Sequence, residues 1–197
     1  MTGFRELLHE LRWDDHRYYH HSIINQSLHL LSASTFVCAY ILLLHDPAMA
    51  SLLGWLVAMT SRQAGHFFFE PKGYDEINRA THEYKEAVKV GYNLARKWVF
   101  MTIWALTPLL LWATPGLFGL LVPHEGPMEF IRHLGLLWLG LALAGLLFRT
   151  IQLFFVRDPM TGLAWAVKIV SDPFHDIKLY HKAPVLLLKG ERFASAH

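Results

Sequence analysis

Cysteine and charge are both scarce in this sequence. Of its 197 residues only Cys38 is a cysteine, and it lies in an apolar run. An intrachain disulfide and a CxxC metal or redox site are therefore excluded. Charged residues make up 17% of the chain and hydrophobic residues 53%, whereas soluble domains carry about 25% charged residues. So few charges would not cover the surface of a soluble domain of this size, and the composition predicts a membrane protein that forms a single domain.

A strong net charge is absent as well. The formal charge is +2, and no basic cluster carries interleaved aromatic residues, which argues against a nucleic-acid partner. The first 21 residues contain Arg5, Arg12, Arg17 and several acids. They lack the apolar core of a cleavable signal peptide, and none is expected.

Long apolar runs are what the sequence does contain. A helix needs about 20 mostly apolar residues to cross a bilayer. Runs of that length occupy residues 22–44, 48–69, 98–122 and 134–156, and Pro108 and Pro115 should kink the third or end it early. The sequence therefore predicts an all-α integral membrane protein with four transmembrane helices in a single domain, 1–197.

The lysines and arginines indicate how these spans are oriented. Three precede the first span, six lie in residues 71–97 and six lie in the tail 157–197, whereas Arg132 stands alone on the other side. Because cytoplasmic connections carry the excess of Lys and Arg, both termini and the long loop are predicted to be cytoplasmic. In a bacterium this would be the inner membrane.

Two amphipathic segments are expected to lie at the membrane surface on that side. Residues 75–97 are rich in helix formers with charges at helical spacing, which predicts a surface helix. Residues 163–170, in the cytoplasmic tail, are apolar again and could form a short interfacial helix that Asp172-Pro173 breaks.

Histidines carry the clearest functional signal. There are 13, and the predicted topology puts ten of them on the cytoplasmic side. Leaving aside His9 and His197 near the termini, the candidates for metal binding are His16, His20, His21, His29, His66, His82, His175 and His181. Neutral imidazole is the commonest metal ligand in proteins. The alternative is that histidines simply favour membrane interfaces.

The spacing of these histidines favours a site at the cytoplasmic ends of the first two spans. His16 and His20 are four residues apart, and so are His21, Asn25 and His29, so each set shares one helix face. His66 lies near the end of the second span and should face His29. Asp14, Asp15, Glu70 and His82 could complete the site.

Two arginines and one C-terminal segment are further candidates. Arg62 and Arg149 each lie one or two turns inside a span, where they could bind a lipid carboxylate, pair with Asp14 or Asp15, or reach the phosphate headgroups. Residues 171–181 are dense in His and Asp, and could supply ligands or a lid. They could equally be a surface loop.

Two motifs resemble those of a known family. Tyr19-His20-His21, Asn25 and His29 fit the pattern YHHxxxNxxxH, and Gly65-His66 with Phe69-Glu70 fits GHxxFE. Together they resemble the small membrane 2-hydroxy fatty acid dioxygenases over residues 19–70. The resemblance implies an Fe(2+) cofactor held by His20, His21, His29 and His66, with Glu70 as a further ligand or as a support for one. It implies that O2 removes the carboxyl carbon of a 2-hydroxy fatty acid, leaving an aldehyde or a shortened acid.

The function expected from the sequence is therefore an iron-dependent oxygenase acting on a lipid at the cytoplasmic membrane face. Glu70 and Arg62 are the candidate catalytic residues, and Arg62 and Arg149 are the candidates for substrate binding. One alternative is a di-iron lipid hydroxylase or desaturase, although the HxxHH clusters of those enzymes are absent. Another is an accessory, haem-binding or pigment-binding subunit of a larger membrane complex. The chain could also form an oligomer.

Overall fold

The computed structural model describes residues 3–70, 73–76 and 78–194, and this part of the chain is helical without named strands. Helix α1 spans Phe4–Tyr19 and α2 spans Ile23–Leu43. Helix α3 (Pro47–Leu53), the π-helical segment η1 (Gly54–Met59) and α4 (Thr60–Phe68) follow one another without a break. The all-α prediction is confirmed for the described residues.

Three long helices and two short ones make up most of the described second half of the chain. Helix α5 covers His82–Val88 and α6 covers Leu94–Ala113, and a 3-10 turn, η2, covers Leu117–Gly119. Helix α7 spans Pro127–Val156, α8 spans Pro159–Tyr180 and α9 spans Ala183–Leu188. The sharp reversal between α7 and α8 is capped by Asp158, whose side chain accepts a hydrogen bond from the Thr161 amide.

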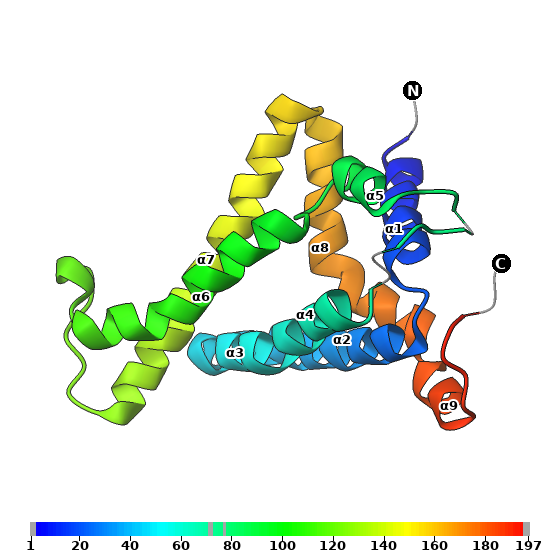
Figure 1. The fold of residues 1–197 in the computed structure, drawn as a ribbon. Helices are drawn as coiled ribbons and strands as arrows, with labels where there is room; N and C mark the ends of the chain where they lie inside the picture. The colour runs from blue at the N-terminus through cyan, green and yellow to red at the C-terminus, as the bar shows by residue number, and fades with distance from the viewer. Residues whose placement is uncertain (1–2, 71–72, 77, 195–197) are drawn as a thin grey trace.

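The helices form two antiparallel pairs that α8 connects. Figure 1 shows α4 alongside α2, and α6 alongside α7. Helix α8 returns from the end of α7 to the start of α2, where it contacts both α2 and α1. Helices α1 and α9 lie at this same end of the molecule (Figure 1). Helix α8 therefore brings residues from the C-terminal third of the chain to α1 and α2.

The core between the two pairs is built from tryptophans and small residues. Trp55 donates a hydrogen bond from Nε1 to the Trp138 carbonyl at 2.9 Å, and both side chains are buried. On α7, Gly135 allows close contact with α3, because a Cβ there would lie 2.4 Å from the Ala48 carbonyl oxygen. Close approach through small residues is typical of helix packing in membranes.

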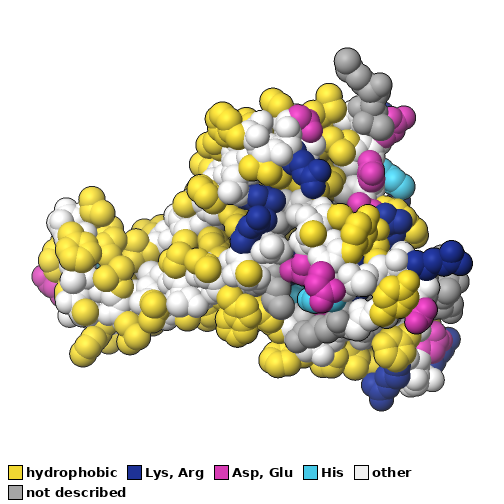
Figure 2. Space-filling model, turned by 45° about the horizontal axis from the view of Figure 1, so that its top comes forward, with side chains coloured by type: hydrophobic (Ala, Val, Ile, Leu, Met, Phe, Trp, Pro, Cys, Tyr) yellow, Lys and Arg dark blue, Asp and Glu magenta, His cyan; other side chains and the backbone are white. Residues whose placement is uncertain are grey.

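Two helices, α2 and α7, are long and apolar enough to cross a membrane by length and composition. Many of the large apolar side chains on α6 and α7 are exposed, and hydrophobic atoms dominate this arm in Figure 2. Lys, Arg, Asp and Glu gather mainly toward the opposite end of the same face. The two apolar helices and the exposed apolar side chains support membrane association. The four spans and their orientation remain predictions.

The surface helix expected over 75–97 is wrong in its extent. Asp75 and Ala80 pair through their backbones, and the Asp75 carboxylate accepts from the Asn78 amide, so this stretch forms a turn. Side chains that bond to nearby backbone groups compete with helix formation. Among the described residues of 75–97, only α5 and the first turn of α6, which Asn93 caps, are helical. Helix α6, which covers most of the predicted third span, ends at Ala113, ahead of Pro115.

The helix break expected at Asp172-Pro173 is also wrong, because α8 continues through Pro173 to Tyr180. A proline inside a helix costs about 3 kcal/mol, so tertiary contacts must hold the helix on both sides of it. Lys168 and Asp172 are paired before the proline, and Asp176 is paired after it. Residues 171–181 are therefore mostly helix, and the surface-loop alternative is wrong.

Candidate metal centre

Three histidines converge where α1, α2 and α4 meet. His20 is the residue at which α1 ends, and side-chain amides of α2 hold that end in place: Asn25 donates to the Tyr19 carbonyl and Gln26 to the His20 carbonyl, each at 2.8 Å. His29 lies in the second turn of α2. The motif spacing thus fixes the end of α1 against the start of α2.

His66 reaches the same point because Gly65 lets α4 approach α2 closely. A Cβ on Gly65 would lie 2.1 Å from Asn25 Oδ1 and 3.4 Å from His29 Cδ2. The distance to Asn25 Oδ1 is too short for any side chain at this position, and the distance to His29 Cδ2 leaves no room to spare. The Gly-His pair therefore places the His66 ring beside that of His29, with the ring centroids 5.0 Å apart.

The geometry of the three rings suits a metal ion. One ring nitrogen from each of His20, His29 and His66 lies within 4.8 Å of the others, and the Nε2 atoms of His20 and His29 are 3.1 Å apart. Two nitrogens that each bind one ion at about 2.1 Å lie roughly 3.0–3.4 Å apart, so this separation fits a shared ion. The three residues are 0–6% exposed. They could hold a metal ion.

The protonation state of His20 agrees with this function. Burial, and then the neighbouring His29, hold the pKa of His20 well below its ordinary value. Its imidazole is therefore neutral at physiological pH, which is the form that binds metals.

Carboxylates lie behind two of the three rings. Glu70 Oε2 is 2.8 Å from His66 Nδ1, and Asp176 Oδ2 is 3.7 Å from His29 Nδ1. Burial raises the pKa of Glu70. A carboxylate on the far nitrogen of a metal-binding histidine fixes the orientation and tautomer of its ring.

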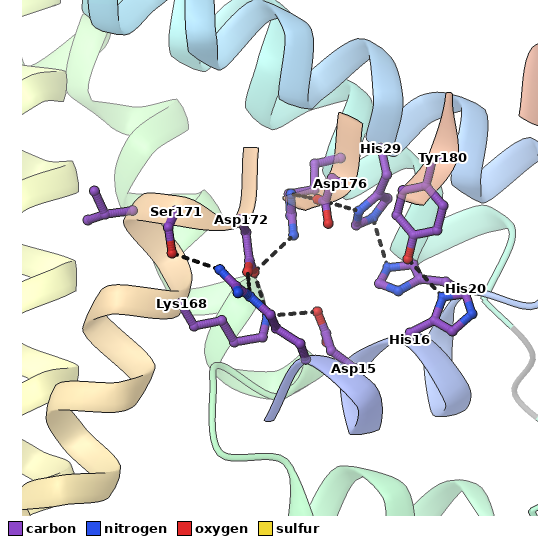
Figure 3. A network of polar contacts seen from close by, with 12 residues as sticks. Asp15, His16, His20, His29, Lys168, Ser171, Asp172, Asp176 and Tyr180 are labelled. Carbon is purple, nitrogen blue, oxygen red and sulfur yellow. Dashed lines mark hydrogen bonds and ion pairs between the residues drawn. The ribbon is translucent and has the colours of Figure 1, made fainter. Parts of the chain in front are cut away.

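A buried ion cluster adjoins the triad and joins α8 to α1 and α4 (Figure 3). Lys168 contacts Asp15 at 3.0 Å and also Asp172, and Asp172 contacts Arg12 at 3.2 Å. Burial would raise the pKa of Asp15, but Lys168 and the other nearby cations hold it well below its usual range.

The other five candidate histidines lie outside the triad. His16 is near it, with Nδ1 3.0 Å from the hydroxyl of the buried Tyr180. His21 points instead toward the loop, 3.3 Å from Asn78 Nδ2 and 3.6 Å from Asp75.

His82 begins α5, His175 is half-buried on α8, and His181 is exposed with its Nδ1 on the Lys178 carbonyl. Of the eight candidates, the structure therefore brings three together and leaves His16 adjacent to them. The iron site carried over from the family resemblance included His21 as a fourth member, and this structure points that ring away.

The two candidate arginines are engaged by the protein itself. Arg62 contacts Asp176 at 3.0 Å and Asp172 at 3.9 Å. Arg149, on α7, donates to the Val90 carbonyl and to Gln152 Oε1. Arg62 therefore adjoins the triad through Asp176, and Arg149 anchors the chain ahead of α6.

The sequence reasoning missed the polar stripe of α8. Lys168, Asp172, Asp176 and Tyr180 recur every four residues, which puts them on one helix face, and all four are buried. This spacing could have been noticed, but the break expected at Pro173 concealed it. The histidines of the same segment, His175 and His181, attracted attention instead.

Comparisons with protein-family models, with curated proteins and with solved structures found no match to this chain. The case for its function therefore rests on the residues and geometry described above.

Proposed function

We propose that this protein is an iron-dependent oxygenase that cleaves 2-hydroxy fatty acids at the cytoplasmic face of a membrane. The observation that carries the proposal is the buried triad of His20, His29 and His66 at the ends of two apolar helical segments. Three imidazoles suit iron, zinc or copper, and the choice of iron follows the family resemblance of the two motifs.

The arrangement favours one ion over the alternatives. A di-iron enzyme needs a second group of metal ligands. In the part of the chain that the structure describes, the triad is the one group of side chains placed to bind an ion. A haem would have to fit between the rings, whose centroids are 4.1–5.5 Å apart. That space suits an ion and small ligands, and is too narrow for a porphyrin.

The reaction balances with O2 as the only oxidant. A 2-hydroxy acid and one O2 give the acid one carbon shorter, CO2 and water, so that four electrons pass from the two carbons to O2. Iron(II), when bound, supplies the redox chemistry that lets O2 react with such a substrate. The three histidines would hold the ion, and their burial would keep bulk water from it.

A cation for the substrate carboxylate is available near the triad. Arg62 already contacts two aspartates. The charge of Lys97, in the first turn of α6, influences the pKa of both His66 and Glu70. Phe67 and Trp98, which follow His66 and Lys97 in the sequence, have their ring centroids 4.9 Å apart. Burial, and then the nearby Lys89, lower the pKa of Lys97 to about 7. A bound carboxylate would favour the charged form of Lys97.

The proposal is tested by metal analysis and product analysis on protein purified in detergent without a histidine tag. We expect about one iron per chain and conversion of a long-chain 2-hydroxy fatty acid to the acid one carbon shorter with O2 uptake. His66→Ala should lose both iron and activity because it removes one of three ligands.

His181→Ala is the matched control, since this histidine is exposed and its Nδ1 lies on the Lys178 carbonyl instead of in the triad. It should keep iron and activity. Iron and activity retained by His66→Ala would overturn the proposal. Zinc or copper in place of iron, with no turnover, would overturn the oxygenase while leaving the metal centre.

A further inference from the structure

Asp176 lies beside the triad, but it does not come from any of the three helices that carry the histidines. Its carboxylate comes from α8, and Oδ2 lies 3.7 Å from Nδ1 of His29. The His29 side chain is fully buried and that of Asp176 is 8% exposed. Figure 3 shows Asp176 and His20 on opposite sides of the His29 ring.

The two nitrogens of His29 have different surroundings. Nε2 faces Nε2 of His20 at 3.1 Å, on the side where the three rings converge. Nδ1 points the other way and is buried without a hydrogen bond among the described residues. If Nε2 binds an ion, Nδ1 must carry the proton, and a buried N–H without an acceptor costs about 1–3 kcal/mol. The carboxylate oxygen 3.7 Å away needs to move by less than about 1 Å to reach hydrogen-bonding distance.

Arg62 holds the same oxygen of that carboxylate. Its guanidinium donates to Asp176 Oδ2 at 3.0 Å and lies 3.9 Å from Asp172. Arg62 precedes His66 by four residues on α4, so one helix carries both a ligand and the anchor of this carboxylate. The charges of Arg62 and Asp176 compensate each other in a site with little access to water.

His66, on α4, already has a carboxylate within hydrogen-bonding distance of its Nδ1. Glu70 Oε2 is within 2.8 Å of His66 Nδ1, in the position relative to His66 that Asp176 takes relative to His29. His20 differs, because its Nδ1 has no hydrogen-bond partner among the described residues. Two of the three rings thus have a carboxylate behind them, one local in sequence and one contributed by α8.

We infer that Asp176, held by Arg62, is a positioning residue of the metal centre: its carboxylate accepts a hydrogen bond from the Nδ1–H of His29 and keeps Nε2 directed at the ion. This rests on the metal centre of the proposed function, but is independent of the substrate. It also assigns Arg62 a role in supporting the site, in place of the substrate clamp expected from the sequence. Helix α8 then becomes part of the metal centre.

The test is a titration of metal-free, full-length protein in detergent with Co(2+), whose visible absorption reports both affinity and the geometry of the ligands. Asp176→Asn keeps the shape of the side chain and removes its charge. We expect its Co(2+) affinity to fall by about 10- to 100-fold, the usual effect of losing such a partner. Asp176→Glu, which retains the carboxylate, should recover part of that affinity.

Asp172→Asn is the matched control. It removes a carboxylate from the same cluster and the same helix face, but Asp172 pairs with Lys168, Arg12 and Arg62 rather than with a histidine. Thermal unfolding of both variants shows how far each weakens the fold. An affinity loss confined to Asp176→Asn supports the inference. Equal losses in both variants would reduce Asp176 to a structural role and overturn it.

His29→Ala separates this inference from the proposed function. If His29→Ala abolishes Co(2+) binding while Asp176→Asn binds normally with an unchanged spectrum, the positioning role is wrong and the metal centre stands. If His29→Ala and His66→Ala both bind Co(2+) like the unaltered protein, the metal centre itself is wrong.

Discussion

At Gly65, helices α4 and α2 come closer than a side chain would allow, and the position of His66 depends on that contact. A Cβ only 2.1 Å from Asn25 Oδ1 cannot be tolerated without movement. Asn25 has little freedom to move, because its amide nitrogen is bonded to the Tyr19 carbonyl, which ends α1. A change at one glycine is therefore transmitted to all three histidines.

Gly65→Ala should consequently displace α4 from α2. Overpacking of this kind costs about 1–3 kcal/mol, and we expect lower thermal stability together with weaker metal binding. Gly140→Ala is the control, because nothing lies within 4 Å of a Cβ on this exposed glycine of α7. Metal content and a thermal unfolding curve of the two variants check the prediction. Normal metal binding by Gly65→Ala would show that the contact is not needed to form the site.

Helix α8 has its polar face buried and much of its apolar face exposed, the reverse of a helix on the surface of a soluble protein. Lys168, Asp172 and Asp176 point inward, while Val167, Val170 and Phe174 are exposed. This distribution is typical of a helix that packs against protein with one face and lipid with the other. The cluster around Lys168 is then what holds α8 against α1.

Lys168→Met tests that attachment. It leaves Asp15 and Asp172 without their shared cation, and breaking a buried ion pair in this way costs about 3–5 kcal/mol. We expect a clearly lower unfolding midpoint in detergent, part of which a second change, Asp172→Asn, should restore. Lys178→Met, on an exposed position of the same helix, should leave the midpoint unchanged. Equal midpoints for Lys168→Met and Lys178→Met would contradict the role of the cluster.

Across the whole molecule, α1 and the ends of α2 and α4 that carry the triad lie on one side, and the turn between α2 and α3 and the segment between α6 and α7 lie away from them (Figure 1). If α2 and α7 cross a membrane, the triad lies on the same side of that membrane as α1 and α8. The positive-inside distribution predicts that this side is the cytoplasm.

Labelling of single cysteines checks this orientation. In a Cys38→Ser background, we expect Glu125→Cys to react with a membrane-impermeant maleimide added to intact cells. Glu10→Cys and His181→Cys should react only after permeabilisation, because both positions are predicted to lie on the cytoplasmic side. All three positions are at least partly exposed, so that burial cannot explain a lack of reaction. Labelling of Glu10→Cys or His181→Cys in intact cells would contradict the predicted topology.

Local patterns in the sequence were enough to predict the helical class, the two longest apolar helices and the pairing of His29 with His66. Each depends on interactions between residues close in sequence: apolar runs favour helices in lipid, and a spacing of four residues places side chains on one helix face. The limits of the helices were less predictable. Asn78 and Asp75 turned a charged stretch away from helix, and ion pairs carried α8 past Pro173.

Only the tertiary structure decided which of the eight histidines meet and what stands behind them. His21 directly follows His20, yet its ring points toward Asp75, because α1 ends between them and the chain changes direction. Asp176 lies far along the chain from His29 and reaches it only because α7 and α8 form a hairpin that returns to α2. Residues adjacent in sequence can thus face apart, and residues from distant helices can contact each other, because packing sets their distances.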